Sequence, residues 1–138
     1  MAVGFRIKFY WYPIGSGEFL HAFFSTVAER LEGSRWGSRF PSIMNELYQG
    51  EMKVEHVQNA IDELDMIMDE LKQLPPSAVV WDFEDKEKTP PWGDNISDDI
   101  TDLSNYFVTG DGSDFLTIFH HALEKSIEMR EPITIRSI

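Results

Sequence analysis

The sequence predicts an α+β fold, in which a small β-sheet of about three to four strands is covered by three to five helices. Three segments rich in β-branched and aromatic residues are typical of strands: residues 3–12, 78–83 and 133–138. Three segments carry apolar residues at helical spacing: residues 19–31, 54–71 and 115–127. No internal repeat, linker or targeting segment interrupts them, so we expect a single domain over residues 1–138.

The first predicted strand, residues 3–12, ends at Pro13, which cannot donate a hydrogen bond to a sheet. Its run Phe9-Tyr10-Trp11-Tyr12 is almost continuously apolar, which predicts a central strand covered on both faces. A turn follows, and in it Ser16 is suited to be the N-cap of the helix expected over residues 19–31.

Two further helices are predicted before the second strand. A short helix through residues 40–47 opens after Trp36-Gly37-Ser38 and is closed by Gly50. The helix at residues 54–71 has the clearest pattern, because acidic residues fill the positions between its apolar ones. Pro75-Pro76 then ends it.

The second predicted strand, residues 78–83, is followed by a long stretch without clear periodicity. Within this stretch we expect a short helical or turn-rich piece at residues 94–103 and a brief extended segment at residues 106–109. Turn residues then precede the next helix.

Ser113 or Asp111 is expected to cap the helix over residues 115–127, because both side chains can accept hydrogen bonds from its first amides. Pro132 separates this helix from the last strand. Apolar and polar residues alternate in that strand, residues 133–138, which predicts one covered and one exposed face.

The composition bounds the class of protein. Hydrophobic residues make up 42% and aromatic residues 13% of the 138 residues, which favours a globular fold over disorder. The absence of cysteine excludes disulfides and thiolate metal sites. No apolar run reaches the length of about 18 residues needed to cross a membrane, and the N-terminus lacks the features of a secretory signal. We therefore expect a cytoplasmic protein without a membrane partner.

Negative charge is concentrated in what we call the acidic segment, residues 82–114. The chain has a net charge of −12, and this segment holds ten acidic residues against Lys86 and Lys88. Aromatic residues, prolines and glycines are interleaved with the acids, which indicates an ordered surface rather than a solvated tail. Such a surface repels nucleic acid and attracts a basic partner, although improved solubility alone would also account for it.

Signals of catalysis are weak. The histidines show no metal-ligand spacing, and Gly15-Ser16-Gly17 lacks the rest of a phosphate-binding motif, so no metal, cofactor or catalytic residue is predicted. Asp82, Glu84 and Asp85 are the exception. In an extended chain Asp82 and Glu84 point to the same side, roughly 7 Å apart, where they are able to bind a divalent cation or act as acid and base.

Trp92 lies between Pro91 and Gly93 in the acidic segment, where no periodic element requires its burial. An exposed tryptophan surrounded by acids has the composition of an interface anchor. Folding back as a lid over the core is the alternative, and the sequence leaves both open.

Several segments, taken in order, resemble the immunity protein 70 family of bacterial polymorphic-toxin systems. The resemblance extends over most of the chain and includes Phe9-Tyr10-Trp11-Tyr12 through Gly15-Ser16-Gly17, Trp36-Gly37-Ser38, Leu47-Tyr48-Gln49-Gly50, Val79-Val80-Trp81-Asp82-Phe83-Glu84-Asp85, Pro91-Trp92-Gly93-Asp94-Asn95-Ile96 and residues 100–109. It implies a small cytoplasmic antidote without enzymatic activity, which binds the C-terminal domain of a secreted or contact-delivered toxin. Many such toxin domains are nucleases with basic surfaces.

The leading hypothesis is therefore a non-enzymatic immunity protein that neutralises a cognate toxin domain. The predicted partner-binding residues are the acids and polar or aromatic residues of the acidic segment: Asp82, Glu84, Asp85, Trp92, Asp94, Asn95, Asp98, Asp99 and Asp102. Two alternatives remain, a small carboxylate-based or metal-dependent hydrolase and a general acidic mimic of nucleic acid. The oligomeric state and the identity of the toxin stay open.

Overall fold

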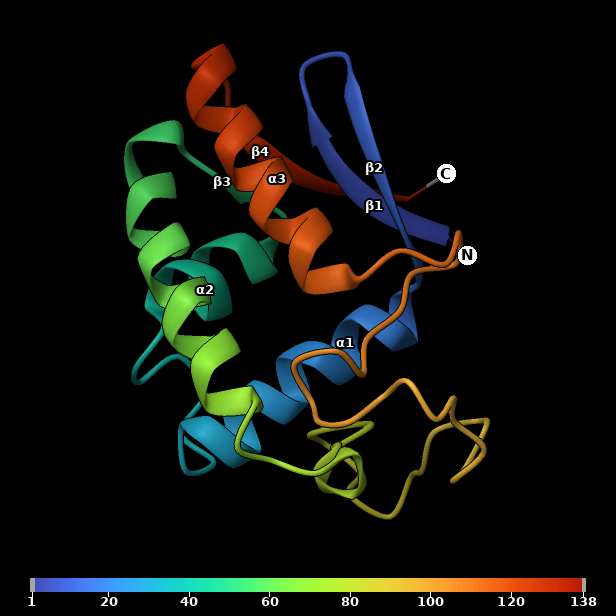
Figure 1. Ribbon diagram of the computed structural model, residues 1–138. Coiled ribbons are helices and arrows are strands. Elements are labelled where there is room, and N and C mark those ends of the chain that lie inside the picture. The colour runs from blue at the N-terminus through green and yellow to red at the C-terminus, as the bar shows by residue number, and fades with distance from the viewer. Residues whose placement is uncertain (1, 138) are drawn as a thin grey trace.

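A computed structural model describes residues 2–137 and contains a four-stranded antiparallel sheet in the order β2-β1-β4-β3 (Figure 1). The strands are β1 (Ala2–Ile7), β2 (Tyr10–Ser16), β3 (Glu51–Met52) and β4 (Ile133–Ser137). β1 and β4 lie side by side in the middle of the sheet, and the Thr134 hydroxyl donates to the Arg6 carbonyl across 128 positions of sequence.

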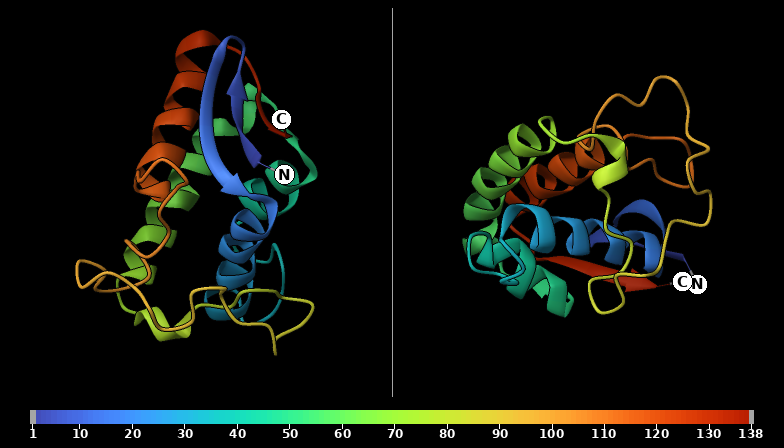
Figure 2. Two further views of the ribbon diagram at one scale, coloured as in Figure 1. Left: turned by 90° about the vertical axis from the view of Figure 1, so that its right-hand side faces the viewer. Right: turned by 90° about the horizontal axis from the view of Figure 1, so that it is seen from below.

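Three α-helices lie within residues 2–137: α1 (Gly17–Thr26), α2 (Val57–Leu71) and α3 (Phe115–Met129). Short π- and 3₁₀-helical turns extend or connect them: η1 (Val27–Leu31), η2 (Ser42–Glu46), η3 (Leu47–Gln49), η4 (Val54–His56) and η5 (Pro76–Ala78). Helices α1 and α3 pack against the sheet and α2 packs against α3 (Figure 2). The predicted α+β class is confirmed. None of the helices in residues 2–137 has the length and apolarity needed to cross a bilayer.

The core lies between the sheet and the helices and is built largely from phenylalanine rings. Phe5 of β1 contacts Phe119 of α3 at a centroid distance of 4.9 Å, and Phe23 of α1 contacts Phe115 of α3 at 5.0 Å. All four side chains are fully buried. Such ring pairs stabilise a core by ~0.5–1.5 kcal/mol each beyond the burial of their area. Here one pair joins α3 to the sheet and the other joins α1 to α3.

The predicted strand at residues 3–12 is confirmed for residues 3–7 and 10–12, but it is not continuous, because the segment forms β1 and the beginning of β2 in a hairpin. The chain turns at Lys8, whose φ of 53° is left-handed, and at Phe9, whose side chain is 81% exposed. Pro13 lies inside β2 instead of ending a strand. β2 is an edge strand of the sheet, a position where proline is tolerated. The aromatic run therefore marks a turn and an exposed edge, not a covered central strand.

The predicted strand at residues 78–83 is wrong. The chain forms the turn η5 and then passes the C-terminal end of α1 without pairing with any strand. The backbone N–H of Val80 donates to the Thr26 hydroxyl at 3.0 Å, and the Phe83 N–H donates to the Ser25 hydroxyl at 2.9 Å. The single proton of the Thr26 hydroxyl has two acceptors within reach, the Ala22 carbonyl at 2.8 Å and the Val80 carbonyl at 3.2 Å. Side chains of α1 thus satisfy backbone N–H groups that a neighbouring strand would otherwise have to satisfy.

The predicted caps and boundaries of the remaining elements agree only in part with the structure. Ser16 caps α1 as predicted, accepting from the Phe19 N–H at 3.1 Å, but α3 is capped by Asp114, not by Ser113 or Asp111. Residues 94–103 form turns without a helix, and the expected extended segment contributes only the bridge between Val108 and Asp114. The last strand is confirmed over the residues described, with Ile138 lying outside them.

A buried carboxylate shapes the loop between η1 and η2. The Glu32 side chain accepts from the backbone N–H groups of Gly37 at 2.9 Å, Arg39 at 2.9 Å and Phe40 at 3.0 Å. The predicted short helix is present as the consecutive turns η2 and η3 and is closed by Gly50 as predicted, but it begins at Ser42 and not at Trp36-Gly37-Ser38. The intervening amides bond to Glu32 and hold the loop outside the helix.

Candidate functional site

The first and longer part of the acidic segment lies at the end of the molecule opposite the β1–β2 hairpin turn (Figures 1 and 2). Its last part runs back towards the sheet, where the Gly110 N–H donates to the Ile14 carbonyl of β2 at 2.8 Å. The predicted residues differ in exposure. Asp82 and Asp102 are half-buried, whereas the others are exposed: Glu84, Asp85, Trp92, Asp94, Asn95, Asp98 and Asp99. The structure therefore presents most of the predicted acids to solvent on one end of the fold.

Trp92 combines the two alternatives that the sequence left open. Its Nε1 donates to the Tyr106 hydroxyl at 2.9 Å, and its ring meets the Trp81 ring edge-on at a centroid distance of 5.3 Å. Trp81 and Tyr106 are buried, and this burial raises the pKa of Tyr106. Trp92 itself remains 38% exposed. One side of Trp92 is fixed to the core while the rest of it faces solvent.

An apolar groove of about 310 Å³ lies beside Trp92. Its lining residues come from α1, the acidic segment and the approach to α3: Phe19, Trp92, Asn95, Ile96, Ser97, Ile100, Tyr106 and Val108. Of the predicted binding residues, Trp92 and Asn95 line this groove. The exposed carboxylates of Asp94, Asp98 and Asp99 belong to the same stretch of chain. The groove is therefore mostly apolar, and the segment that forms much of its lining also carries these exposed acids.

Asp102 and Asn105 hold the far end of the segment in shape. The Asp102 carboxylate accepts from the Ser104 N–H at 2.8 Å and from the hydroxyls of Ser104 and Thr101, and these bonds lower its pKa. Asn105 Oδ1 accepts from the N–H groups of Thr101 and Asp102, and its Nδ2 donates to the Asp99 carbonyl at 3.0 Å. Asn105 was not among the predicted residues, although asparagine commonly forms such turns.

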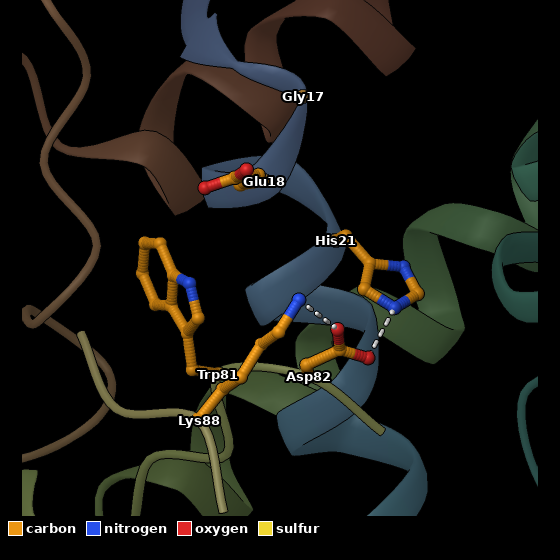
Figure 3. A pocket seen from close by; sticks show the side chains of 6 residues that line it. All are labelled: Gly17, Glu18, His21, Trp81, Asp82 and Lys88. Carbon is orange, nitrogen blue, oxygen red and sulfur yellow. Dashed lines mark ion pairs between the residues drawn. The ribbon is translucent and has the colours of Figure 1, made fainter. Parts of the chain in front are cut away.

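Asp82 lies at the other end of the segment and makes three contacts (Figure 3). Its Oδ1 accepts from the Glu84 N–H at 2.9 Å and lies 3.4 Å from Nε2 of His21, while its Oδ2 lies 3.5 Å from Nζ of Lys88. The bond from Glu84, followed by the nearby His21 and Lys88, lowers the pKa of Asp82. Because Asp82 and Glu84 form a turn, the extended arrangement that would pair their carboxylates is wrong.

His21 connects the segment to the rest of the fold. Its Nδ1 lies 3.3 Å from the Tyr48 hydroxyl, its Nε2 faces Asp82, and its ring stacks on Trp36. The interpretation of His21 as a satisfied, half-buried histidine agrees with this setting. No group of three or more histidine or acidic side chains within residues 2–137 is arranged to hold a metal ion.

We expect replacement of Asp82 by Asn to lower the free energy of unfolding by roughly 1 kcal/mol at pH 7, since a charged acceptor is replaced by a neutral one. The pKa of Asp82 is lowered by folding, so the carboxylate contributes its full stability above its ordinary value of 3.8. As the pH falls below 3.8 and through the lowered pKa, that contribution is lost. Urea unfolding at pH 7, 5 and 3 measures the free energy of unfolding of the wild type and of the Asp82→Asn variant. The difference between these two free energies should become smaller only at pH 3. A constant difference would contradict this assignment.

Comparison with known proteins gives one match. A family model described as Immunity protein 70 matches residues 5–135. No curated protein and no solved structure matches the chain.

Proposed function

Since the chain belongs to the immunity protein 70 family, we propose that it acts in the cytoplasm as a non-enzymatic antidote, which binds the toxic domain of a cognate bacterial toxin. The proposed binding surface, called here the acidic surface, comprises the exposed predicted residues and the groove beside them: Glu84, Asp85, Trp92, Asp94, Asn95, Asp98 and Asp99. Asp82 and Asp102 support this surface and add to its charge.

The observation that carries the proposal is the half-exposed Trp92 at the edge of an apolar groove within an acidic stretch. Tryptophan is enriched among the residues that dominate binding energy, particularly where a polar rim surrounds it. Trp92 is already held by Tyr106 and Trp81. Binding therefore loses little side-chain entropy at this position, which favours affinity.

The charge of the surface indicates a basic partner. A chain of net charge −12 with its excess acid gathered at one end attracts a cationic protein and accelerates their encounter. Nucleases have basic surfaces because they bind phosphates, so a nuclease domain fits this surface in charge. Blocking the nucleic-acid-binding face of such a domain would neutralise it without any chemistry by the antidote.

Growth rescue tests the proposal. Bacteria that express the toxin domain encoded beside this gene should survive when the wild-type chain is co-expressed. Replacement of Trp92 by Ala should abolish rescue and weaken binding by about 30-fold or more, equivalent to ~2 kcal/mol for an interface anchor. Trp11→Ala is the matched control, because Trp11 is 37% exposed but lies on β2.

The outcomes separate the proposal from its alternatives. Rescue by wild type and Trp11→Ala, with loss in Trp92→Ala that unfolds normally in urea, supports the antidote role and its surface. Equal rescue by all three proteins would place the interface elsewhere. No rescue and no binding by the wild type would overturn the antidote function itself. Capture of many unrelated basic proteins, lost at physiological salt, would indicate a general mimic of nucleic acid.

A further inference from the structure

A second cavity, of about 200 Å³, opens between the start of α1 and the beginning of the acidic segment (Figure 3). It is lined by Gly17, Glu18, His21, Trp81, Asp82 and Lys88. Trp81 separates this cavity from the groove, because it lines the cavity and its ring meets that of Trp92. The two hollows therefore lie on either side of one aromatic pair.

The lining has the chemistry of a receptor for a cation. It offers the carboxylates of Glu18 and Asp82, and the part of the Trp81 indole that reaches it is small, because Trp81 is only 7% exposed. The N-terminus of α1 does not offer a free anion site here, since Ser16 caps it and Glu18 lies in its first turn. With His21 neutral, the lining carries two negative charges and one positive charge, that of Lys88.

Lys88 occupies this cavity only loosely. Its Nζ lies 3.5 Å from Asp82 Oδ2, longer than the ~2.7–2.9 Å of a strong charge-assisted bond. Its side chain is 58% exposed, so it can move into solvent at small cost. Within residues 2–137, Glu18 has no ion-pair partner. The cavity thus holds a weakly bound internal cation beside an unused carboxylate.

We propose that this cavity receives an arginine side chain of the partner toxin domain, and that Lys88 occupies its place in the free protein. The inference rests on the proposed function and adds a cationic subsite next to the apolar groove. Arginine fits better than lysine because its planar guanidinium presents its N–H donors in a fixed fork, which can bond to a carboxylate through two parallel hydrogen bonds. A volume of about 200 Å³ exceeds that of several waters at ~30 Å³ each, and so accommodates a guanidinium group.

The test titrates the isolated protein with a small probe, N-acetyl-arginine N-methylamide. Binding is monitored through the NMR signals of the Trp81 indole and the Glu18 amide. We expect saturable shifts with a dissociation constant in the millimolar range, and binding at least tenfold weaker for the citrulline analogue, which has the same shape but no charge. Glu18→Gln should weaken binding severalfold. Lys88→Gln should strengthen it severalfold by removing the internal competitor.

Lys72→Gln is the matched control for charge, because it changes the net charge equally from the end of α2. Three outcomes would each overturn the arginine subsite. The first is that Lys72→Gln strengthens probe binding as much as Lys88→Gln does. The second is that the citrulline analogue binds as tightly as the arginine probe, and the third is that no saturable shifts are seen. These failures leave growth rescue and its dependence on Trp92 intact, so they are distinguishable from failure of the antidote function. Probe binding without any capture of the toxin domain would support the cation specificity and overturn the partner.

Discussion

We expect the double variant Asp94→Lys/Asp98→Lys to associate with the toxin domain at least tenfold more slowly than the wild type at low salt, with the difference shrinking as salt is added. Both residues are exposed, and neither side chain takes part in a hydrogen bond or ion pair within residues 2–137. Reversing them changes the field of the acidic surface without disturbing its turns. Steering by such a field acts on the association rate and is screened by salt. Stopped-flow association at several salt concentrations measures the effect.

A control with the same net charge separates local from overall electrostatics. Glu55→Lys/Asp62→Lys places the reversals on η4 and α2, away from the acidic segment. This variant should associate nearly as fast as the wild type. Equal slowing in both double variants would show that only the total charge matters, and unchanged rates in both would move the interface to another face.

The second large effect concerns stability. Replacing Glu32 with Ala should lower the free energy of unfolding by about 3 kcal/mol or more, because each backbone N–H left without a partner costs ~1–3 kcal/mol. Glu32 is 4% exposed and accepts from the three N–H groups of Gly37, Arg39 and Phe40. Urea unfolding followed by tryptophan fluorescence measures the change.

Two other variants sharpen this prediction. Glu32→Gln keeps one acceptor oxygen, so its free energy of unfolding should lie between those of the wild type and Glu32→Ala. Glu55→Ala removes an exposed glutamate and should change stability by no more than about 0.5 kcal/mol. If Glu32→Ala unfolds at the wild-type urea concentration, the loop amides have found other acceptors and the carboxylate does not organise the loop.

The helices were predictable because their signals are local. The apolar positions between Val57 and Leu71 recur at the helical period, and the buried residues of α2 follow that pattern. The hairpin was not predictable in the same way. Its turn at Lys8 and Phe9 lacks the Asn-Gly type of signal that marks tight turns, and its edge strand is unusually aromatic. The aromatic run indicated burial, whereas burial is decided by which elements cover the strand.

The predicted second strand failed for a tertiary reason. A run such as Ala78-Val79-Val80-Trp81 is equally suited to a strand or to a buried loop. The hydroxyls of Thr26 and Ser25 favour the loop by accepting from the N–H groups of Val80 and Phe83, and nothing near Val80 in sequence reveals those contacts. The two-residue strand β3 is too short to leave a periodic signal.

The candidate site was predictable where it depends on composition. Charge and aromatic content identified the segment around Trp92, and the structure exposes most of its acids. The residues that complete the two hollows come from elsewhere in the chain, including Glu18, Phe19 and His21 of α1. Their roles arise from long-range packing, so a local motif could not indicate them.

The central position of β1 and β4 affects how quickly this protein folds. The middle of the sheet joins strands that are separated by almost the whole described chain, and such distant contacts slow folding because a long loop must close first. During synthesis, β1 can pair with β2 but not with β4 until the ribosome has released residues 133–137. A newly made chain therefore completes its sheet only after translation of this region. Under the function proposed above, protection against an incoming toxin then depends on copies that were folded beforehand.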